Sequence, residues 1–280
     1  MKILITGANG TVGSDLVNFF SKNCKVYAIY RTSNKINRSM KSKNIFWIMH
    51  DLKRKINLNI NPTVVIHCAV THEFKKRNFI KDYVDSNIIS LMNIVNFSKK
   101  KKIKKFFNFS SYAVYNANKL DILSITKIIS ENLIKKSNLN YLNLRLPGVL
   151  TYSLSDKRRP WLNNIINKLR LNKKIEIYNG NKSFNSVIDT FEIYKFIYKQ
   201  IGKNKLNNDI FNLTASKPIK LSKVVKYLKH RINSKSNIVY LKKNKKDFKI
   251  TNPKNKIKYQ LPSTRLVIDR FLDGQALYEK

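Results

Sequence analysis

The sequence predicts an α/β fold built on a doubly wound parallel sheet. Apolar segments with the length of strands alternate with helical patterns through the first two thirds of the chain. Continuous apolar strands separated by helices are typical of a parallel sheet that is covered on both faces. Three of the seven glycines, Gly7, Gly10 and Gly13, fall between the first strand and the first helix. A hydrophobic fraction of 42% is ample for a buried core.

Six strands are expected in the first two thirds of the chain, at 2–6, 25–30, 45–49, 63–67, 106–110 and 141–145. Two long helices are expected among them, near residues 79–99 and 121–137. Pro147 then interrupts the regular pattern. Beyond it we expect a helix at 161–171, a late strand at 211–213 that returns to the sheet, and a helix near 221–232 among short strands.

The charge of the chain is extreme, because 56 Lys and Arg face 16 Asp and Glu, a formal net charge of +40. Such a charge fits a polyanionic partner, for example nucleic acid or an anionic membrane surface. The lysines are scattered, however, and Lys, Asn and Ile are all abundant, which favours a general compositional bias. We therefore expect no nucleic-acid partner, while the positive field favours anionic small ligands.

Cysteine usage and hydropathy indicate a cytoplasmic protein. Only two cysteines occur, Cys24 and Cys68, so a disulfide framework is not expected. No apolar run approaches the roughly 20 residues of a membrane span. Met1 and Lys2 lead directly into the first strand, which leaves no room for a signal peptide.

The glycine cluster has the sequence context of a dinucleotide site. The run Thr6-Gly7-Ala8-Asn9-Gly10-Thr11-Val12-Gly13 joins an apolar strand to an amphipathic helix. Glycine is needed where a side chain would block the approach of backbone to phosphate or the packing of helix on sheet. The start of the helix then offers free N–H groups and a positive dipole end to a pyrophosphate.

Further motifs follow in order along the chain: Asp51-Leu52, His67-Cys68-Ala69-Val70, Asn87, Ser110-Ser111-Tyr112-Ala113-Val114-Tyr115 and Arg145-Leu146-Pro147-Gly148-Val149. Together with the glycine run they resemble motifs of the extended short-chain dehydrogenases/reductases, the NAD-dependent epimerase/dehydratase family. The resemblance covers nearly the whole chain. It implies a Rossmann-type domain over 1–150, to which a late strand near 210–214 returns, and a small split C-terminal substrate lobe over 151–187 and 215–280.

The resemblance implies cofactor contacts from the glycine turn, the Asp-Leu pair, the fourth strand and the helix asparagine, namely Gly7, Asn9, Gly10, Thr11, Val12, Gly13, Asp51, Leu52, His67, Cys68, Ala69 and Asn87. At the end of the second strand, where NAD-preferring sites carry an acidic residue for the ribose, this chain has Arg31. Because a guanidinium suits phosphate geometry, Arg31, assisted by Lys35, favours NADP over NAD.

The catalytic pair of the family, YxxxK, is only half present. Lys127, followed by Glu131, matches the lysine that holds the nicotinamide ribose, although a helical pair between the two would give the same spacing. Leu123 stands where the family has the tyrosine that works as general acid/base, a role worth typically 10²–10⁴-fold in rate. Ser111 matches the catalytic serine that binds the reacting oxygen, and a local backbone cap is its alternative role.

Two residues are weaker candidates for substrate contacts. Tyr112 lies beside Ser111, and Tyr112 or Tyr115 is a candidate replacement for the missing phenol, although packing beside the cofactor is the favoured role. Lys182 precedes Ser183 and Phe184 where the family has Arg-Asp-Phe near the diphosphate of the substrate.

A metal site is not expected. His67, Cys68, His72 and Glu73 carry ligand-type side chains close together in sequence. His67 and Cys68 point to opposite faces of a strand, while His72 and Glu73 lie beyond it. The resemblance explains His67 without a metal.

These observations support two main hypotheses. The first is an NAD(P)-dependent oxidoreductase of the epimerase/dehydratase type that acts on a nucleotide-linked sugar, with hydride transfer to or from nicotinamide. The alternative is an NAD(P)-binding pseudoenzyme with a regulatory or scaffold role, because the tyrosine is missing at Leu123. A nucleic-acid binder is a third, weaker hypothesis. By analogy with the family, the two long helices are expected to pair two copies in a homodimer.

Overall fold

The computed structural model describes residues 1–32, 42–71, 80–115, 121–152, 161–241 and 255–278. Its central sheet consists of seven parallel strands: β1 (Lys2–Thr6), β2 (Lys25–Tyr30), β3 (Ile45–Met49), β4 (Val64–His67), β5 (Lys105–Ser111), β6 (Tyr141–Leu146) and β11 (Asp209–Asn212). Their order is β11-β6-β5-β4-β1-β2-β3. The winding direction therefore reverses between β1 and β4, where the carboxyl ends of the strands leave room for a ligand.

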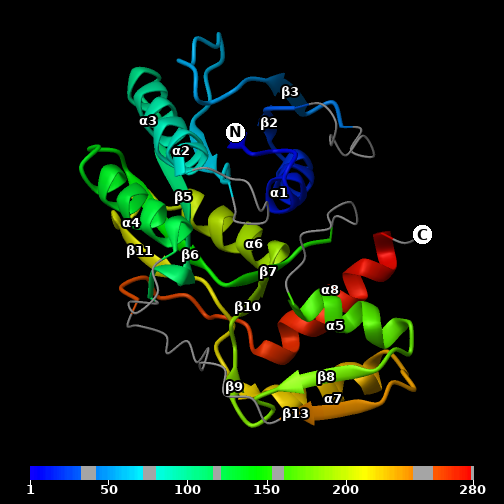
Figure 1. Cartoon of the computed structure of the whole chain (residues 1–280). Helices are drawn as coiled ribbons and strands as arrows, with labels where there is room; N and C mark the ends of the chain where they lie inside the picture. Colours follow the sequence, from blue (N-terminus) through cyan, green and yellow to red (C-terminus); the bar gives the residue numbers. More distant parts are fainter. Residues whose placement is uncertain (33–41, 72–79, 116–120, 153–160, 242–254, 279–280) are drawn as a thin grey trace.

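Helices cover both faces of the sheet (Figure 1). Helices α1 (Thr11–Ser21) and α6 (Thr190–Ile201) lie together on one face. The other face carries α4 (Ile122–Lys135) and one long helical stretch made of α2 (Ile80–Tyr83), the π-helical η2 (Val84–Ile89) and α3 (Ser90–Lys100).

Alternating side chains of β1 show how the sequence builds these two layers. Ile3 and Ile5 belong to the core that contains residues of α1 and α6, whereas Leu4 belongs to the core that contains Leu91 and Ile94 of α3. All five side chains are fully buried. The period of two along a strand thus supplies both faces of the sheet from one short apolar run.

The predicted α/β class and doubly wound parallel sheet are confirmed. Each of the six predicted strands is present, and the late strand forms β11, which pairs in parallel with β6. Both long helices are present, with the π-helical turn of η2 as an unexpected feature. Helix α6 was not predicted from the sequence. It begins where the Asp189 carboxylate accepts the Glu192 N–H, and it buries Ile193 and Phe196 against the sheet.

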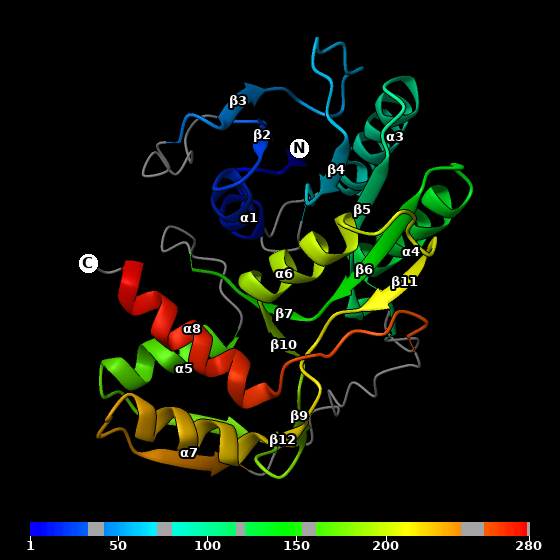
Figure 2. The same ribbon diagram turned by 180° about the vertical axis from the view of Figure 1, so that it is seen from behind.

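The C-terminal part adds three two-stranded ladders and three helices below the sheet (Figure 2). The helices are α5 (Trp161–Arg170), α7 (Leu221–Arg231) and α8 (Thr264–Tyr278). The ladders pair β7 (Gly148–Leu150) with β10 (Val187–Asp189), β8 (Ile175–Tyr178) with β13 (Ile238–Leu241), and β9 (Ser183–Phe184) with β12 (Ile219–Lys220). The domain division at 1–150, 151–187 and 215–280 stays a prediction. Among the described residues, no helix has the length and apolar character needed to cross a membrane.

Candidate active site

The glycine turn between β1 and α1 has a backbone that excludes side chains at two positions. Gly7 has a φ of +65°, and a Cβ there would lie 2.9 Å from the backbone Cα of Ala69. A Cβ on Gly13 would overlap the Gly7 carbonyl oxygen and lie 2.9 Å from the carbonyl carbon. The Gly10 N–H donates to the Gly7 carbonyl at 2.9 Å, which closes the turn. Gly7 and Gly13 are therefore required by the close approach of backbone to backbone.

The turn opens into the start of α1, which fits a pyrophosphate. Gly10 is the N-cap of α1, and no side chain of the described residues caps this end. Thr11 and Val12, partly buried, form the first turn of the helix. An uncapped helix start at the sheet's switch point presents N–H groups and a positive dipole to an anion. The residues that the sequence predicted for the phosphates thus come together in one turn.

Asn9 and Arg31 lie where this turn meets the end of β2. The Asn9 side-chain amide donates to the Thr32 carbonyl at 2.9 Å and so fastens the turn to the segment after β2. Arg31 is exposed, as a group that binds a ribose phosphate needs to be. Lys35, predicted to assist it, lies outside the described residues.

His67 at the end of β4 is buried and neutral. Its Nδ1 lies 2.8 Å from the Thr6 hydroxyl, across the β1–β4 pairing that places Thr6 opposite His67. Burial, reinforced by the nearby Lys127 charge, lowers the pKa of His67 to about 3. His67 therefore ties the ends of two central strands together. Burial also raises the pKa of the neighbouring Cys68 thiol, which keeps it protonated at neutral pH.

No group of three or more metal-ligating side chains is present among the described residues. His72 and Glu73, which the sequence places near His67, lie outside them.

Lys127 is buried beneath the end of β5. Its Nζ donates to the Phe109 carbonyl at 2.6 Å. Burial lowers the pKa of Lys127 to about 8, while the Cys68 and Glu131 side chains partly oppose that shift. An amine with such a pKa can exchange a proton near neutral pH, and it keeps further N–H groups for a ligand.

Glu131, four residues after Lys127, is bonded to a different partner. Both of its carboxylate oxygens accept from Arg145 on β6, at 2.9 Å and 2.6 Å. Oε1 also accepts from the Ser110 hydroxyl at 2.5 Å. This bidentate pair locks α4 onto β5 and β6. The sequence did not predict the Glu131–Arg145 pair, because the two residues belong to different elements.

Neither Tyr112 nor Tyr115, the two candidate replacements for the missing phenol, is arranged for proton transfer in this structure. Leu123 stands on α4 one turn before Lys127 and carries no ionisable proton. Tyr115 donates its hydroxyl to Asn212 Oδ1 at 2.7 Å, and the Arg145 guanidinium lies 4.6 Å from its ring centroid. Burial, together with Tyr115, raises the pKa of Tyr112, which keeps that phenol neutral.

Ser111 ends β5 and begins the 3₁₀ turn η3 (Tyr112–Tyr115). Its hydroxyl oxygen accepts the Ala113 N–H at 3.1 Å, which is the local backbone cap considered as its alternative role. A hydroxyl that accepts one bond still has its own hydrogen to donate. Ser111 and Lys127 are placed by the same strand, because β5 carries both Ser111 and the Phe109 carbonyl.

The remaining predicted contacts differ in accessibility. Asn87 is buried in η2, where it accepts the Thr71 N–H at 2.8 Å and donates to the Thr126 hydroxyl at 3.1 Å. Asp51 follows β3 and accepts the Lys53 N–H, whereas the Leu52 side chain is buried in the core. Asn87 and Leu52 thus hold the framework in this structure.

Two residues of the C-terminal side of the site remain to be placed. Lys182, predicted to contact substrate, is exposed in the connection between β8 and β9, and the structure does not bring it to the glycine turn. Asp15 of α1 was not predicted as a site residue. Its Oδ2 accepts from the Tyr152 N–H at 2.7 Å and from the Thr190 hydroxyl at 2.6 Å. The sequence contained a signal for this contact, because an aspartate on the apolar face of a helix needs a buried hydrogen-bond partner.

Comparison with known proteins identifies the family. A profile of the NAD dependent epimerase/dehydratase family matches residues 3–213, which contain the whole glycine turn, β4 and α4. The chain belongs to this family. The family assignment therefore rests on most of the chain and not on the glycine turn alone. No curated protein matches the chain.

Three solved structures illustrate the shared fold. A UDP-N-acetylglucosamine 4-epimerase from Methanobrevibacter ruminantium M1, in complex with UDP-N-acetylmuramic acid, has a TM-score of 0.78 at 19% identity, over 97% of this chain and 98% of that chain. A UDP-glucose 4-epimerase from Thermotoga maritima with UDP-glucose has 0.74 at 15%, over 98% and 99%. A UDP-glucuronic acid 4-epimerase from Bacillus cereus, in complex with NAD, has 0.68 at 20%, over 86% and 87%.

Proposed function

We propose that the chain is an NAD(P)-dependent oxidoreductase of the epimerase/dehydratase type that acts on a nucleotide-linked sugar. One observation carries the proposal: Gly7 and Gly13 leave no space for side chains in a turn that feeds an uncapped helix at the switch point. That geometry suits a dinucleotide. The UDP-sugar complexes of the M. ruminantium and T. maritima structures support the substrate class.

We propose these roles for the residues that match the family motifs. NAD(P), when bound, supplies the nicotinamide that takes or returns a hydride at a substrate carbon. Lys127, held at the Phe109 carbonyl, directs its remaining N–H groups to the ribose hydroxyls. Ser111 donates its hydroxyl hydrogen to the reacting oxygen of the substrate, while Lys182 reaches the diphosphate from the C-terminal part.

The same proposal favours NADP over NAD. The segment that ends β2 reads Tyr30-Arg31-Thr32 and contains no acidic residue for a ribose diol. Arg31 is exposed beside Thr32, which is fastened to Asn9 of the phosphate turn. A guanidinium at this point suits a 2′-phosphate.

A calorimetric titration with NAD, NADP and their reduced forms tests the cofactor part. We expect NADP to bind more tightly, and Arg31→Glu to shift the preference toward NAD by about tenfold or more. Lys22→Glu, an equal charge change at an exposed site on the C-cap of α1, is the matched control and should leave the ratio unchanged. Absence of heat with every nucleotide, on folded protein, would refute the proposal.

Turnover is a separate measurement, and Leu123 makes binding without family chemistry the second candidate function. UDP-glucose, UDP-N-acetylglucosamine and UDP-glucuronic acid are assayed for epimerisation and for NAD(P)H formation. Turnover by the natural chain supports the enzyme. Tight NADP binding with no turnover of any nucleotide sugar supports the binding protein.

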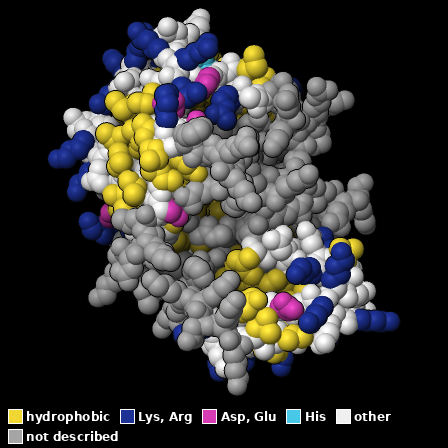
Figure 3. Space-filling view, viewed as in Figure 1, with side chains coloured by type: hydrophobic (Ala, Val, Ile, Leu, Met, Phe, Trp, Pro, Cys, Tyr) yellow, Lys and Arg dark blue, Asp and Glu magenta, His cyan; other side chains and the backbone are white. Residues whose placement is uncertain are grey.

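We also propose that two copies pair through the two long helices. Exposed apolar side chains gather on these helices, where Figure 3 shows a hydrophobic patch: Ile80, Val84, Ile89 and Met92 of α2–α3 and Ile125 and Ile129 of α4. A patch of this kind on adjacent helices is suited to self-association. Analytical ultracentrifugation should find a dimer that Ile129→Lys dissociates.

We also propose a cytoplasmic location. The thiols of the two described cysteines, Cys24 and Cys68, are free, which supports a reducing compartment.

A further inference from the structure

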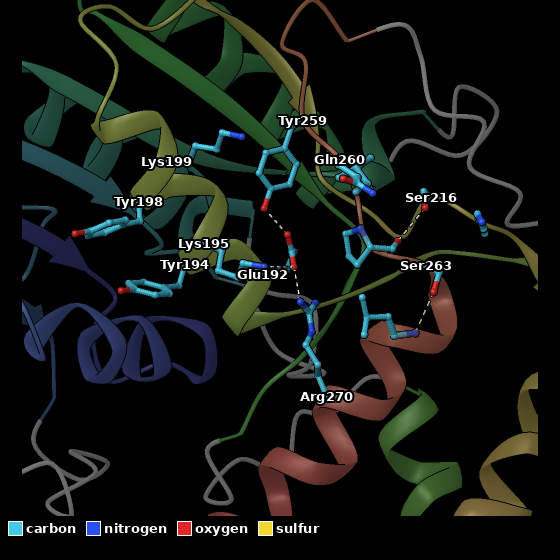
Figure 4. A pocket seen from close by; sticks show the side chains of 14 residues that line it. Glu192, Tyr194, Lys195, Tyr198, Lys199, Ser216, Tyr259, Gln260, Ser263 and Arg270 are labelled. Atoms are coloured by element: carbon cyan, nitrogen blue, oxygen red, sulfur yellow. Dashed lines mark hydrogen bonds and ion pairs between the residues drawn. The ribbon is translucent and has the colours of Figure 1, made fainter.

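A cavity of about 690 Å³ lies on the outer side of α6, between that helix, the segment 259–263 and the start of α8. Figure 4 shows its residues. None of the glycine-turn residues lines it. Its volume falls in the range of small-molecule sites. The cavity is therefore a separate recess, and the function proposed above does not use it.

The walls of the cavity carry an excess of positive charge. Lys195, Lys199, Lys217 and Arg270 line it, and Glu192 is the one carboxylate among its described lining residues. The Arg270 guanidinium is already paired with carboxylates, because it donates to Glu192 at 2.6 Å and to Asp189 at 3.0 Å and 3.1 Å. The three lysines are exposed at the rim. They are the groups left to meet an anion.

The carboxylate in the cavity makes its short contacts with groups other than these lysines. Glu192 accepts from Arg270 and from the Tyr259 hydroxyl, and Lys195 comes no closer than 3.9 Å to it. Figure 4 shows Glu192 between Tyr259 and Arg270, with Lys199 directed toward Tyr259. The Lys199 ammonium lies 5.6 Å from the centroid of the Tyr259 ring. Among the described lining residues, four cationic side chains thus face one carboxylate, and the net charge of the lining is positive.

The lining also includes exposed apolar surface. Tyr198 on α6 and Leu266 on α8 are each 47% exposed and line the cavity. The Tyr198 ring is backed by Tyr194, with ring centroids 5.7 Å apart. A flat ring can lie on such surfaces while a phosphate meets the lysines. The floor is held in place by the Arg270 and Tyr259 bonds, so a ligand would not need to order it.

We propose that this cavity binds a ligand that joins a planar ring to a diphosphate, the chemistry of a nucleoside diphosphate. The site lies apart from the dinucleotide turn, so one chain takes a dinucleotide and a further nucleotide at the same time. The diphosphate lies on Lys195, Lys199 and Lys217, and the ring lies against the exposed side chain of Tyr198.

The experiment is a calorimetric titration of the full chain with ADP and with UDP, carried out in the presence and absence of excess NADP. The triple variant Lys195→Gln/Lys199→Gln/Lys217→Gln removes the rim charges. Lys99→Gln/Lys100→Gln/Lys104→Gln is the matched control, since it removes the same charge at exposed positions of α3 and the turn after it. We expect the cavity triple to weaken the nucleotide by about tenfold or more, and the control triple by less than about threefold.

Two further measurements test the ring and the place of binding. Tyr198→Ala should weaken the binding of ADP, and inorganic pyrophosphate should bind to the natural chain less tightly than ADP does. Tyr240→Ala, at a 43% exposed tyrosine of β13, is the control. Hydrogen exchange of the 259–266 amides should slow when ADP binds. Equal weakening in both lysine triples, or ADP binding with no effect on 259–266, overturns the proposal. Because NADP binding is recorded separately, loss of the proposed oxidoreductase function leaves this test intact.

Discussion

The cofactor end and the proton-transfer end of the candidate site differ in how they are built. At the cofactor end, Gly7 and Gly13 are held by backbone against backbone, and His67 is buried against Thr6. At the other end, Lys127 keeps its place under β5, while Leu123 removes the phenol one turn away. For the proposed function, the difference implies that binding depends on the path of the main chain, whereas the chemistry depends on single side chains that a substitution can remove without disturbing the fold.

The sharpest way to break this comparison is to restore the phenol. Leu123→Tyr should raise turnover of the correct nucleotide sugar by about 10²–10⁴-fold, because a positioned acid/base is worth that much. NAD(P)H absorbance and product analysis measure the change. Leu123→Phe adds the same ring without the hydroxyl and should give no gain. An equal effect of both variants would mean that shape, and not proton transfer, limits the reaction.

A methyl group in the glycine turn tests the cofactor end. Gly13→Ala should cost about 2–4 kcal/mol of unfolding free energy and abolish NAD(P) binding, because the added Cβ overlaps the Gly7 carbonyl. Urea unfolding and calorimetry measure the two effects. Gly202→Ala is the control: its Cβ would lie 3.6 Å from the Lys199 oxygen, and its φ of −68° is helical. It should change stability by less than about 1 kcal/mol.

The buried lysine makes stability depend on pH in alkaline solution. The pKa of Lys127 is about 8 in the folded chain, below its ordinary value of 10.5, so between these values the unfolded chain binds more protons. Stability should therefore rise as the pH increases from 8 toward 10.5, by about 2–3 kcal/mol. Urea unfolding at several pH values measures it. Lys127→Met should lack this rise, and a slope that persists in the variant would assign it to another group.

A smaller pH effect should come from the cofactor end in acid. The pKa of His67 is about 3 in the folded chain and 6.5 in the unfolded chain, so the unfolded chain binds more protons between these values. The contribution of His67 to the unfolding free energy is complete above pH 6.5, and it should fall by about 2 kcal/mol as the pH drops to 5. His67→Gln should flatten this part of the curve. An unchanged curve would show that the acid loss of stability comes from another group and that the pKa of His67 is not lowered in the folded chain.

The sheet could be predicted from the sequence, because apolar runs such as 2–6 and 63–67 carry their own signal. The glycine turn could be placed for the same reason, since its neighbours in space are its neighbours in the chain. Helix α6 was missed because tyrosines and lysines separate its apolar residues and because the polar Glu192 and Gln200 lie on its buried face, although Asp189 supplies a cap.

Contacts between residues far apart in the chain could not be predicted from the sequence. Arg145 bonds with Glu131 across two elements, and β13 pairs with β8, about 60 residues earlier in the chain. Local periodicity carries no information on such partners. The same reason explains why Ser111 and Lys127 could be proposed from a family motif, while the partner of Lys127, a main-chain carbonyl, could not be predicted.

Asp15 limits how the chain can be shortened. Its carboxylate is buried, and its partners are donors at Tyr152 and Thr190, both beyond the first 150 residues. A fragment that stops at residue 150 would lose these two donors and helix α6, which packs against α1, and it would also leave β6 as a bare sheet edge without β11. The N-terminal half should consequently fail to fold autonomously, so that truncation, a common route to an isolated nucleotide-binding module, is closed for this protein.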